Sequence, residues 1–275
     1  MDTQDADNGA LTGRAWLAAL PGELAAQRRV MAALVDRCAG WPLVTSLQVG
    51  CSLGRGAGDA LSDIDAALGV DAPDGEAGAA QIDATAELVA TALPELGSLV
   101  DVLRHRAGPA GRPVRRIFAQ FADGTQLDLA VVPEPEIEAR RRSGGAPDFV
   151  ALYLAPGPWG EREADDRSPG GEPAAAYAVT GDQVREWSFM GWCALLDADK
   201  YLRRGSHWEA HARLHEARER IWALWAAAQG AMYPWHGLSQ VLDHDPGNLP
   251  PGIESSVAGL DAADLRRAAR ASAGV

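Results

Sequence analysis

The stretch that most constrains this chain runs from Val49 to Val70 and reads VGCSLGRGAGDALSDIDAALGV. An apolar strand ends there in a loop that holds four glycines, and a second strand follows the loop. The second strand carries Asp63 and Asp65, and side chains two residues apart on a strand share one face. Two carboxylates at a strand edge, opposite a glycine-rich turn, predict a site that holds divalent metal on a phosphate chain.

The composition is that of a globular protein with a real core. The chain has 275 residues, of which 47% are apolar and 23% charged, so it can form one large or two smaller domains. No apolar run approaches the roughly 20 residues that span a bilayer, and the acidic start MDTQDADNGA is unlike a signal peptide. Cys38, Cys51 and Cys193 are too widely spaced for a disulfide framework or a zinc site. We therefore expect a cytoplasmic protein with no membrane partner.

The charge of the chain argues against a nucleic-acid partner. The formal net charge is −13, whereas proteins that bind phosphate backbones accumulate Lys and Arg. A small partner is expected instead, and an acidic surface favours a cationic one.

The first half of the chain alternates helices and strands, and the second half is helical. A short helix from about Arg14 precedes a longer one, and Asp123-Gly124 predicts a hairpin between two later strands. The predicted elements of this half are the helix Gly22–Arg37, the strand Leu43–Val49, the helix Gln81–Leu93 ended by Pro94, the strands Leu99–Leu103, Arg116–Phe121 and Gln126–Val132, and the helix Glu134–Arg142.

A third carboxylate is available on the second hairpin strand. Asp128 lies between Leu127 and Leu129 in QLDLAVVP and points to the face opposite those leucines. It is the third acid that a site for two metal ions needs. Asp101, in LVDVL, is the rival for this place.

The segment Pro156–Pro173 is rich in Pro, Gly and acidic residues and predicts a linker or lid. Two amphipathic helices follow, Asp182–Arg204 and Ser206–Gln229, and Ala262–Ala271 predicts a last one. Ser206 with Glu209 has the pattern of a capping box.

His211 and His215 have zinc-compatible spacing without a third ligand, so exposed histidines are expected. Five tryptophans are expected in the core of this helical half: Trp187, Trp192, Trp208, Trp222 and Trp225.

The fold class expected from these patterns is α+β. A domain at 1–155, with a mixed sheet and flanking helices, precedes a linker or lid at 156–176 and a helical, substrate-binding bundle at 177–275.

Lys200 is the one lysine among 25 basic residues. In an Arg-rich sequence, a lysine that persists is a candidate for a tight phosphate contact. The compact ammonium group of lysine suits such a contact better than the broad, planar guanidinium group of arginine. A chance surface lysine is the alternative.

The motifs Ser52-Leu53-Gly54-Arg55 and Ser62-Asp63-Ile64-Asp65, followed by Asp128 on a later strand, resemble the nucleotidyltransferase superfamily with the DNA polymerase beta-like fold. The helical half that follows makes the chain similar to antibiotic nucleotidyltransferases, which modify aminoglycosides or lincosamides. One residue departs from the pattern, because the glycine that usually precedes the motif serine is Cys51 here.

The resemblance implies Mg²⁺-dependent transfer of a nucleoside monophosphate, most simply AMP from ATP or another nucleoside triphosphate, to a hydroxyl of a small molecule. Asp63, Asp65 and Asp128 would be the catalytic and metal-binding residues for two Mg²⁺ ions. The nucleotide would be held by Ser52, Leu53, Gly54, Arg55, Ser62 and Lys200. Antibiotic resistance is one role that such an enzyme serves.

Two alternatives stay open at this point. The enzyme could modify a protein hydroxyl, as toxin–antitoxin members of the superfamily do, or the chain could be a non-catalytic nucleotide-binding module. The oligomeric state and the acceptor are not predicted.

Overall fold

The computed structural model describes residues 13–107, 113–142, 148–156, 179–231 and 233–275. The chain divides into two compact units, Met1–Ala174 and Ala175–Val275, and each is described by itself. The predicted linker or lid at 156–176 lies almost wholly outside the described residues, so the predicted domain limits stay a prediction. No described helix is both long enough and apolar enough to cross a membrane.

Unit 1 is built on a six-stranded sheet in the order β3-β4-β5-β2-β1-β6. β2 and β5 pair in parallel, whereas the other neighbouring strands pair antiparallel, so the sheet is mixed. The strands are β1 (Val44–Val49), β2 (Ile64–Val70), β3 (Leu99–Ala107), β4 (Val114–Phe121), β5 (Gln126–Pro133) and β6 (Val150–Leu154).

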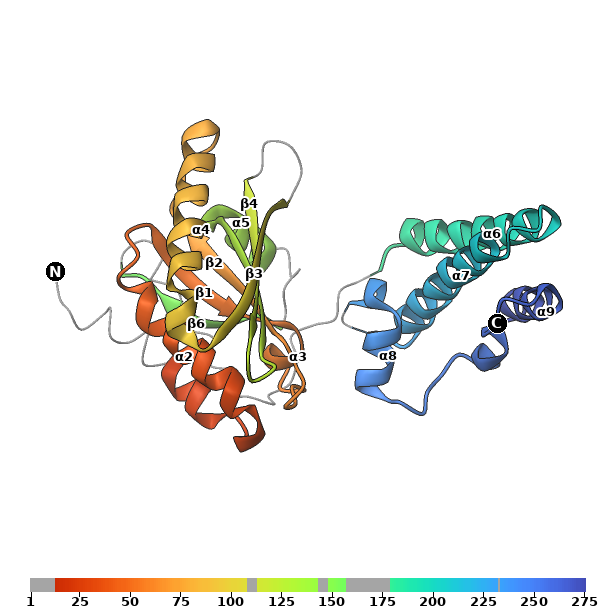
Figure 1. Ribbon diagram of the computed structural model, residues 1–275, viewed down its shortest axis with the longest axis horizontal. Helices are drawn as coiled ribbons and strands as arrows, with labels where there is room; N and C mark the ends of the chain where they lie inside the picture. Colours follow the sequence, from red (N-terminus) through yellow and green to blue (C-terminus); the bar gives the residue numbers. More distant parts are fainter. Residues whose placement is uncertain (1–12, 108–112, 143–147, 157–178, 232) are drawn as a thin grey trace. The chain divides into compact units, whose positions relative to one another are not determined.

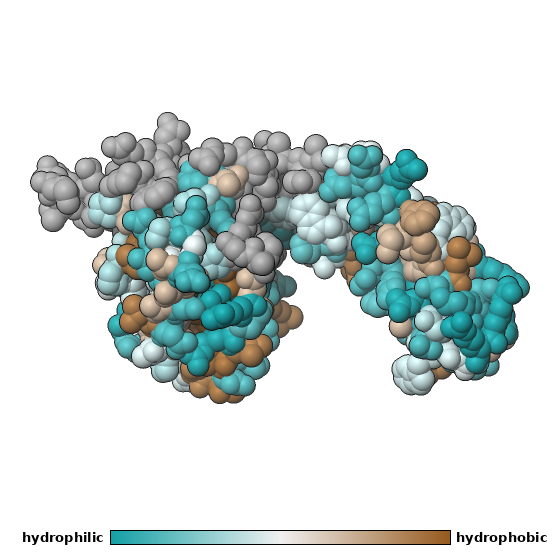
Figure 2. Space-filling model, turned by 90° about the horizontal axis from the view of Figure 1, so that it is seen from above, coloured by the Kyte–Doolittle hydropathy of each residue, from teal (hydrophilic) through white to brown (hydrophobic). Residues whose placement is uncertain are grey.

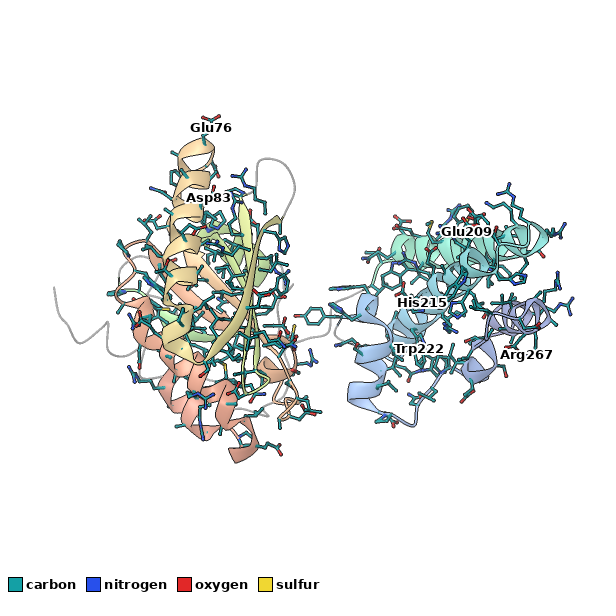
Figure 3. The ribbon with its side chains drawn as sticks, in the orientation of Figure 1. Glu76, Asp83, Glu209, His215, Trp222 and Arg267 are labelled. Atoms are coloured by element: carbon teal, nitrogen blue, oxygen red, sulfur yellow. The ribbon has the colours of Figure 1, made fainter. Side chains whose placement is uncertain are left out.

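The two faces of the sheet are covered differently. Helices α2 (Ala25–Cys38) and α4 (Glu76–Leu96) pack on one face and enclose the main core with inward side chains such as Ile64, Leu127 and Leu129 (Figure 1). An ion pair between Arg115 of β4 and Asp83 of α4, which Figure 3 labels, accompanies this packing. On the other face, α5 (Glu134–Arg142) covers only the carboxyl ends of β2 and β5. Among the described helices of unit 1, α5 does not extend over their amino ends on that face.

Unit 2 is helical. Helices α6 (Gly181–Arg203) and α7 (His207–Ala228) form a hairpin against which α9 (Ala262–Ser272) packs, and Figure 3 shows Glu209 and His215 on α7 and Arg267 on α9. The short helix α8 is Leu238–His244, and the 3-10 turns η1, η2 and η3 are Gly22–Leu24, Pro234–His236 and Ile253–Ser256. The expected α+β class, with a mixed sheet followed by a helical region, is confirmed.

Several local predictions were wrong, each for a physical reason. The helix predicted at Gln81–Leu93 begins at Glu76 and continues past Pro94 to Leu96. The proline removes one backbone hydrogen bond, but Leu93 and Leu96 on either side of it are buried, so core packing holds this last turn in place. The glycine loop contains a four-residue helix, α3 (Cys51–Gly54), and β6 was not predicted. Ser206 caps α7 without a side-chain hydrogen bond, and the capping box is instead that of Thr180 and Gln183 on α6.

The tryptophan prediction also fails in part. Trp187 is buried, but Trp192 and Trp208 are 56% and 75% exposed. The hairpin of α6 and α7 packs through small residues such as Ala198, Ala210 and Ala217, which bring the helices too close for large rings. Figure 2 shows hydrophobic patches within a mainly hydrophilic surface on both units.

A buried carboxylate fixes the junction between β5 and α5. Glu134 is fully buried, and its Oε2 accepts hydrogen bonds from the Thr45 hydroxyl at 2.7 Å and the Ser46 hydroxyl at 2.6 Å. Gly69 leaves the space for it, because a Cβ on Gly69 would lie 1.7 Å from that same oxygen.

We predict that Gly69→Ala destabilises unit 1 by about 2–4 kcal/mol, because the new methyl group displaces a buried, hydrogen-bonded carboxylate. Calorimetry should show a lower unfolding temperature. Gly22→Ala is the control, since a Cβ there meets nothing within 4 Å. Equal effects of the two changes would contradict the role given to Glu134.

Candidate active site

The three predicted carboxylates lie at one end of the sheet, on the face that α5 leaves open. Asp65 of β2 and Asp128 of β5 are register partners across the parallel pair, and adjacent strands lie about 4.8 Å apart. Asp63 immediately precedes β2 on the same face as Asp65. Because β1 runs antiparallel to β2, its last residue reaches the same end of the sheet, and the Gly50 N–H donates to the Asp65 carbonyl at 2.9 Å.

Asp65 carries the electrostatic signature of this crowding. Its pKa is raised, first by burial, then by the negative charge of Asp63 and more weakly by that of Asp128. The thiol of Cys51 donates a hydrogen bond to the Asp65 carboxylate, and this bond lowers the pKa of Asp65. A divalent cation would relieve this repulsion.

Asp128 is not free in this arrangement. Arg116 of β4 makes a two-pronged contact with it, in which Nε donates to Oδ1 at 2.8 Å and a guanidinium nitrogen donates to Oδ2. The side chain of Asp128 is 14% exposed and that of Arg116 is 38% exposed, so the carboxylate is the more shielded partner of this pair. Among the residues that the structure describes, no three His, Cys, Asp or Glu side chains form a ready metal site. Arg116 was not predicted from the sequence, although alternation places it on the same face as Phe118.

The turn after β1 is shaped by close packing. Gly54 must be small, because a Cβ there would lie 1.8 Å from the Asp148 carbonyl. Its N–H donates to the Gly50 carbonyl at 3.1 Å, and Arg55 Nη1 lies 3.1 Å from the fully buried Asp148 carboxylate. Leu53 is buried and Ser52 half-buried. Nucleotide binding by Ser52, Leu53, Gly54 and Arg55 stays a prediction.

The loop between this turn and β2 is held by a side chain of α2. Gln27 is 2% exposed, and its Nε2 lies 3.5, 3.2 and 2.9 Å from the carbonyls of Asp59, Ala60 and Ser62. The Ser62 hydroxyl bonds within the loop, accepting from the Asp59 N–H at 3.0 Å. Ser62 therefore shapes the loop that delivers Asp63, and its contact with nucleotide stays a prediction.

A second anchor links α2 to the hairpin before Asp128. Arg29 forms an ion pair with Asp123, which begins the Asp123-Gly124 turn. The hairpin prediction is confirmed, with Gly124 at a φ of 89° and the Gly124 N–H bonded to the Phe121 carbonyl at 3.0 Å.

Lys200 lies in unit 2, on α6. Its Nζ pairs with Asp197 and sits 5.0 Å from the centre of the Tyr201 ring. Its predicted role at the phosphates stays a prediction. His215 pairs with Glu219 at 3.5 Å, and both side chains are exposed.

No family model and no curated protein matches the sequence. The solved structures that are similar to this chain include the following two. An aminoglycoside 6-adenyltransferase from Bacillus subtilis aligns over 88% of this chain and 84% of its own, with 12% identity and a TM-score of 0.33. A nucleotidyltransferase-like protein from Exiguobacterium sibiricum aligns over 87% and 70%, with 12% identity and a TM-score of 0.36.

Cys51 takes the conformation that glycine adopts at no cost. Its φ is 54°, the one positive value among the described residues other than glycine. A side chain in this region costs about 1–2 kcal/mol. Burial raises the pKa of the thiol above its ordinary value, as does the charge of Asp65, so the thiol stays protonated and can donate.

We predict that Cys51→Gly is more stable than Cys51→Ala by about 1 kcal/mol, because both variants lose the thiol and only alanine keeps the strain. Urea unfolding of the two variants measures the difference. At the exposed helical Ala84, glycine should instead be less stable than alanine by about 1 kcal/mol. Glycine being worse at both positions would refute the strain at Cys51.

We also predict that Gln27→Met loosens the loop at 56–63, because methionine fills the space of glutamine without its N–H donors. Amide hydrogen exchange at Asp59, Leu61 and Ser62 should accelerate by about tenfold. Gln81→Met on α4 serves as the control and should leave these amides unchanged. Unchanged exchange in both variants would show that the loop holds without Gln27.

Proposed function

We propose that the chain is a Mg²⁺-dependent nucleotidyltransferase, which moves a nucleoside monophosphate, most simply AMP from ATP, to the hydroxyl of a small molecule. The observation that supports this most is the parallel register of β2 and β5. It sets Asp65 beside Asp128, with Asp63 on the same face. The turn after β1, which contains Ser52, lies at the same end of the sheet.

The donor set suits Mg²⁺, a hard cation that prefers carboxylate oxygens. Asp63, Asp65 and Asp128 would hold it, and the bound metal would stabilise the charge that develops on the attacking and leaving oxygens. Arg116 must first release Asp128. Because Arg116 would then stay within reach of the same face, it is a candidate partner for the phosphates, beside Arg55 of the same unit.

The reaction balances without a further reagent. The acceptor hydroxyl oxygen forms a bond to the α-phosphorus, and the bond from that phosphorus to the bridging oxygen of the β-phosphate breaks. Pyrophosphate leaves with the bonding electrons. The hydroxyl proton passes to a base, for which Asp128 is the candidate once Arg116 has released it.

A non-catalytic nucleotide-binding module is the second candidate. The Arg116–Asp128 pair favours it, because a permanent pair would keep the third carboxylate from metal. A protein acceptor would be a variant of the first proposal.

We predict that Asp63→Asn combined with Asp65→Asn abolishes pyrophosphate release, by at least about a thousandfold, in a screen of nucleoside triphosphates against hydroxyl acceptors. The same double variant should lose the rise in melting temperature that Mg²⁺ gives the parent. Without metal it should melt at the same or a higher temperature, because ionised Asp65 is disfavoured in the folded state, as its raised pKa shows.

The matched control is Asp71→Asn combined with Asp74→Asn, which removes two exposed carboxylates beyond the other end of β2. It should keep both activity and the effect of Mg²⁺. Turnover that survives in the Asp63/Asp65 variant would refute the site. Nucleotide binding without pyrophosphate release from any acceptor, including co-expressed proteins, would establish the binding module.

A further inference from the structure

A cavity of about 300 Å³ lies beside the carboxylates, on the open face of the sheet. Asp63 and Asp128 line it, and it extends from them across β4 to β3. The strand register explains its lining. Leu103, Phe118 and Asp128 form one row across β3, β4 and β5, and Asp101, Gln120 and Gln126 form the next row on the same face.

One wall of the cavity is apolar. Leu103 is 61% exposed and Phe118 is 37% exposed, so together they offer an apolar surface beside Asp128. The ring of Phe118 is held in place, because His105 stacks on it at 5.5 Å between ring centres and Arg116 lies 5.3 Å from its centre. Such a fixed wall suits a flat or alkyl face of a ligand.

The other wall is polar and acidic. Asp101, Gln120 and Gln126 supply a carboxylate and two amides, and neither Lys nor Arg is among the described residues that line the cavity. A triphosphate would meet repulsion here, whereas a protonated amine would be attracted. Arg116 balances the charge of Asp128 at one end of the cavity. Asp101 lies in the next register row, beyond Phe118, so this acidic part of the cavity suits a cation better than phosphates.

We propose that this cavity binds the acceptor, and that the acceptor carries an apolar ring or alkyl face and a protonated amine beside its reacting hydroxyl. That the ligand is the acceptor of a transfer reaction rests on the proposed function. The chemistry of the ligand is inferred from the cavity alone. Leu103 and Phe118 contact the apolar face, Asp101 pairs with the amine, and the hydroxyl lies toward Asp63 and Asp128. Asp101, the rival third acid, thereby has a binding role instead of a metal-binding one.

The test measures binding without any nucleotide, by titration with ligand-observed NMR of three related probes. The probe 2-amino-1-phenylethanol has the ring, the amine and the hydroxyl; ethanolamine lacks the ring, and 1-phenylethane-1,2-diol lacks the amine. We expect the complete probe to bind about tenfold more tightly than either of the others.

Two variants test separately how the polar wall and the apolar wall contribute to the affinity for the probes. Asp101→Asn should weaken the complete probe about tenfold and leave the diol unchanged, and Leu103→Ala should weaken the complete probe about threefold and leave ethanolamine unchanged. The controls are Asp74→Asn and Leu88→Ala, which remove an exposed carboxylate and an exposed leucine outside the cavity. Because all four side chains are exposed, the variants should fold.

Equal affinities for the three probes, or no effect of Asp101→Asn and Leu103→Ala, would overturn the inference. The pyrophosphate assay separates it from the proposed function. Selective binding without turnover would support the cavity chemistry and count against the enzyme. Turnover with acceptors that lack ring and amine, at a KM unchanged in both variants, would support the enzyme and overturn the inference.

Discussion

The parallel pairing of β2 with β5 is the constraint on which unit 1 depends. β1 runs antiparallel to β2, so the amino ends of β2 and β5 and the carboxyl end of β1 meet at one end of the sheet. Asp65 and Asp128, near the beginnings of these two strands, are register partners, although they are 63 residues apart in the sequence (128 − 65). Burial and then the negative charge of Asp63 raise the pKa of Asp65, which is the cost of this arrangement, and the charge of Arg116 acts in the opposite direction.

Sequence reasoning was most successful where local rules decide the structure. Alternation predicted the faces of β2 and β5, and the Asp123-Gly124 pair predicted the hairpin, because both signals act over a few residues. It failed where distant contacts decide. β6 pairs with β1 from about a hundred residues away, and the surface position of Trp208 depends on how closely α6 and α7 approach. At the site, the Gln27 anchor was missed for the same reason. The Arg116–Asp128 pair spans the predicted hairpin, and the register of that hairpin is the signal that could have indicated it.

Cys51 combines an unusual backbone conformation with a side-chain contact. Its backbone takes the left-handed conformation that suits glycine, and its thiol donates a hydrogen bond to the Asp65 carboxylate. The first residue of the turn after β1 therefore contributes directly to the surroundings of Asp65.

Helix α2 contacts both segments that deliver carboxylates. Through Gln27 it holds the loop before Asp63, and through Arg29 it holds the turn before Asp128. When a single stiff rod carries two attachments, a tilt or slide of the rod displaces both in the same sense. Thermal motion of α2 would therefore move the segments that carry Asp63 and Asp128 together, and it would preserve the distance between the two carboxylates.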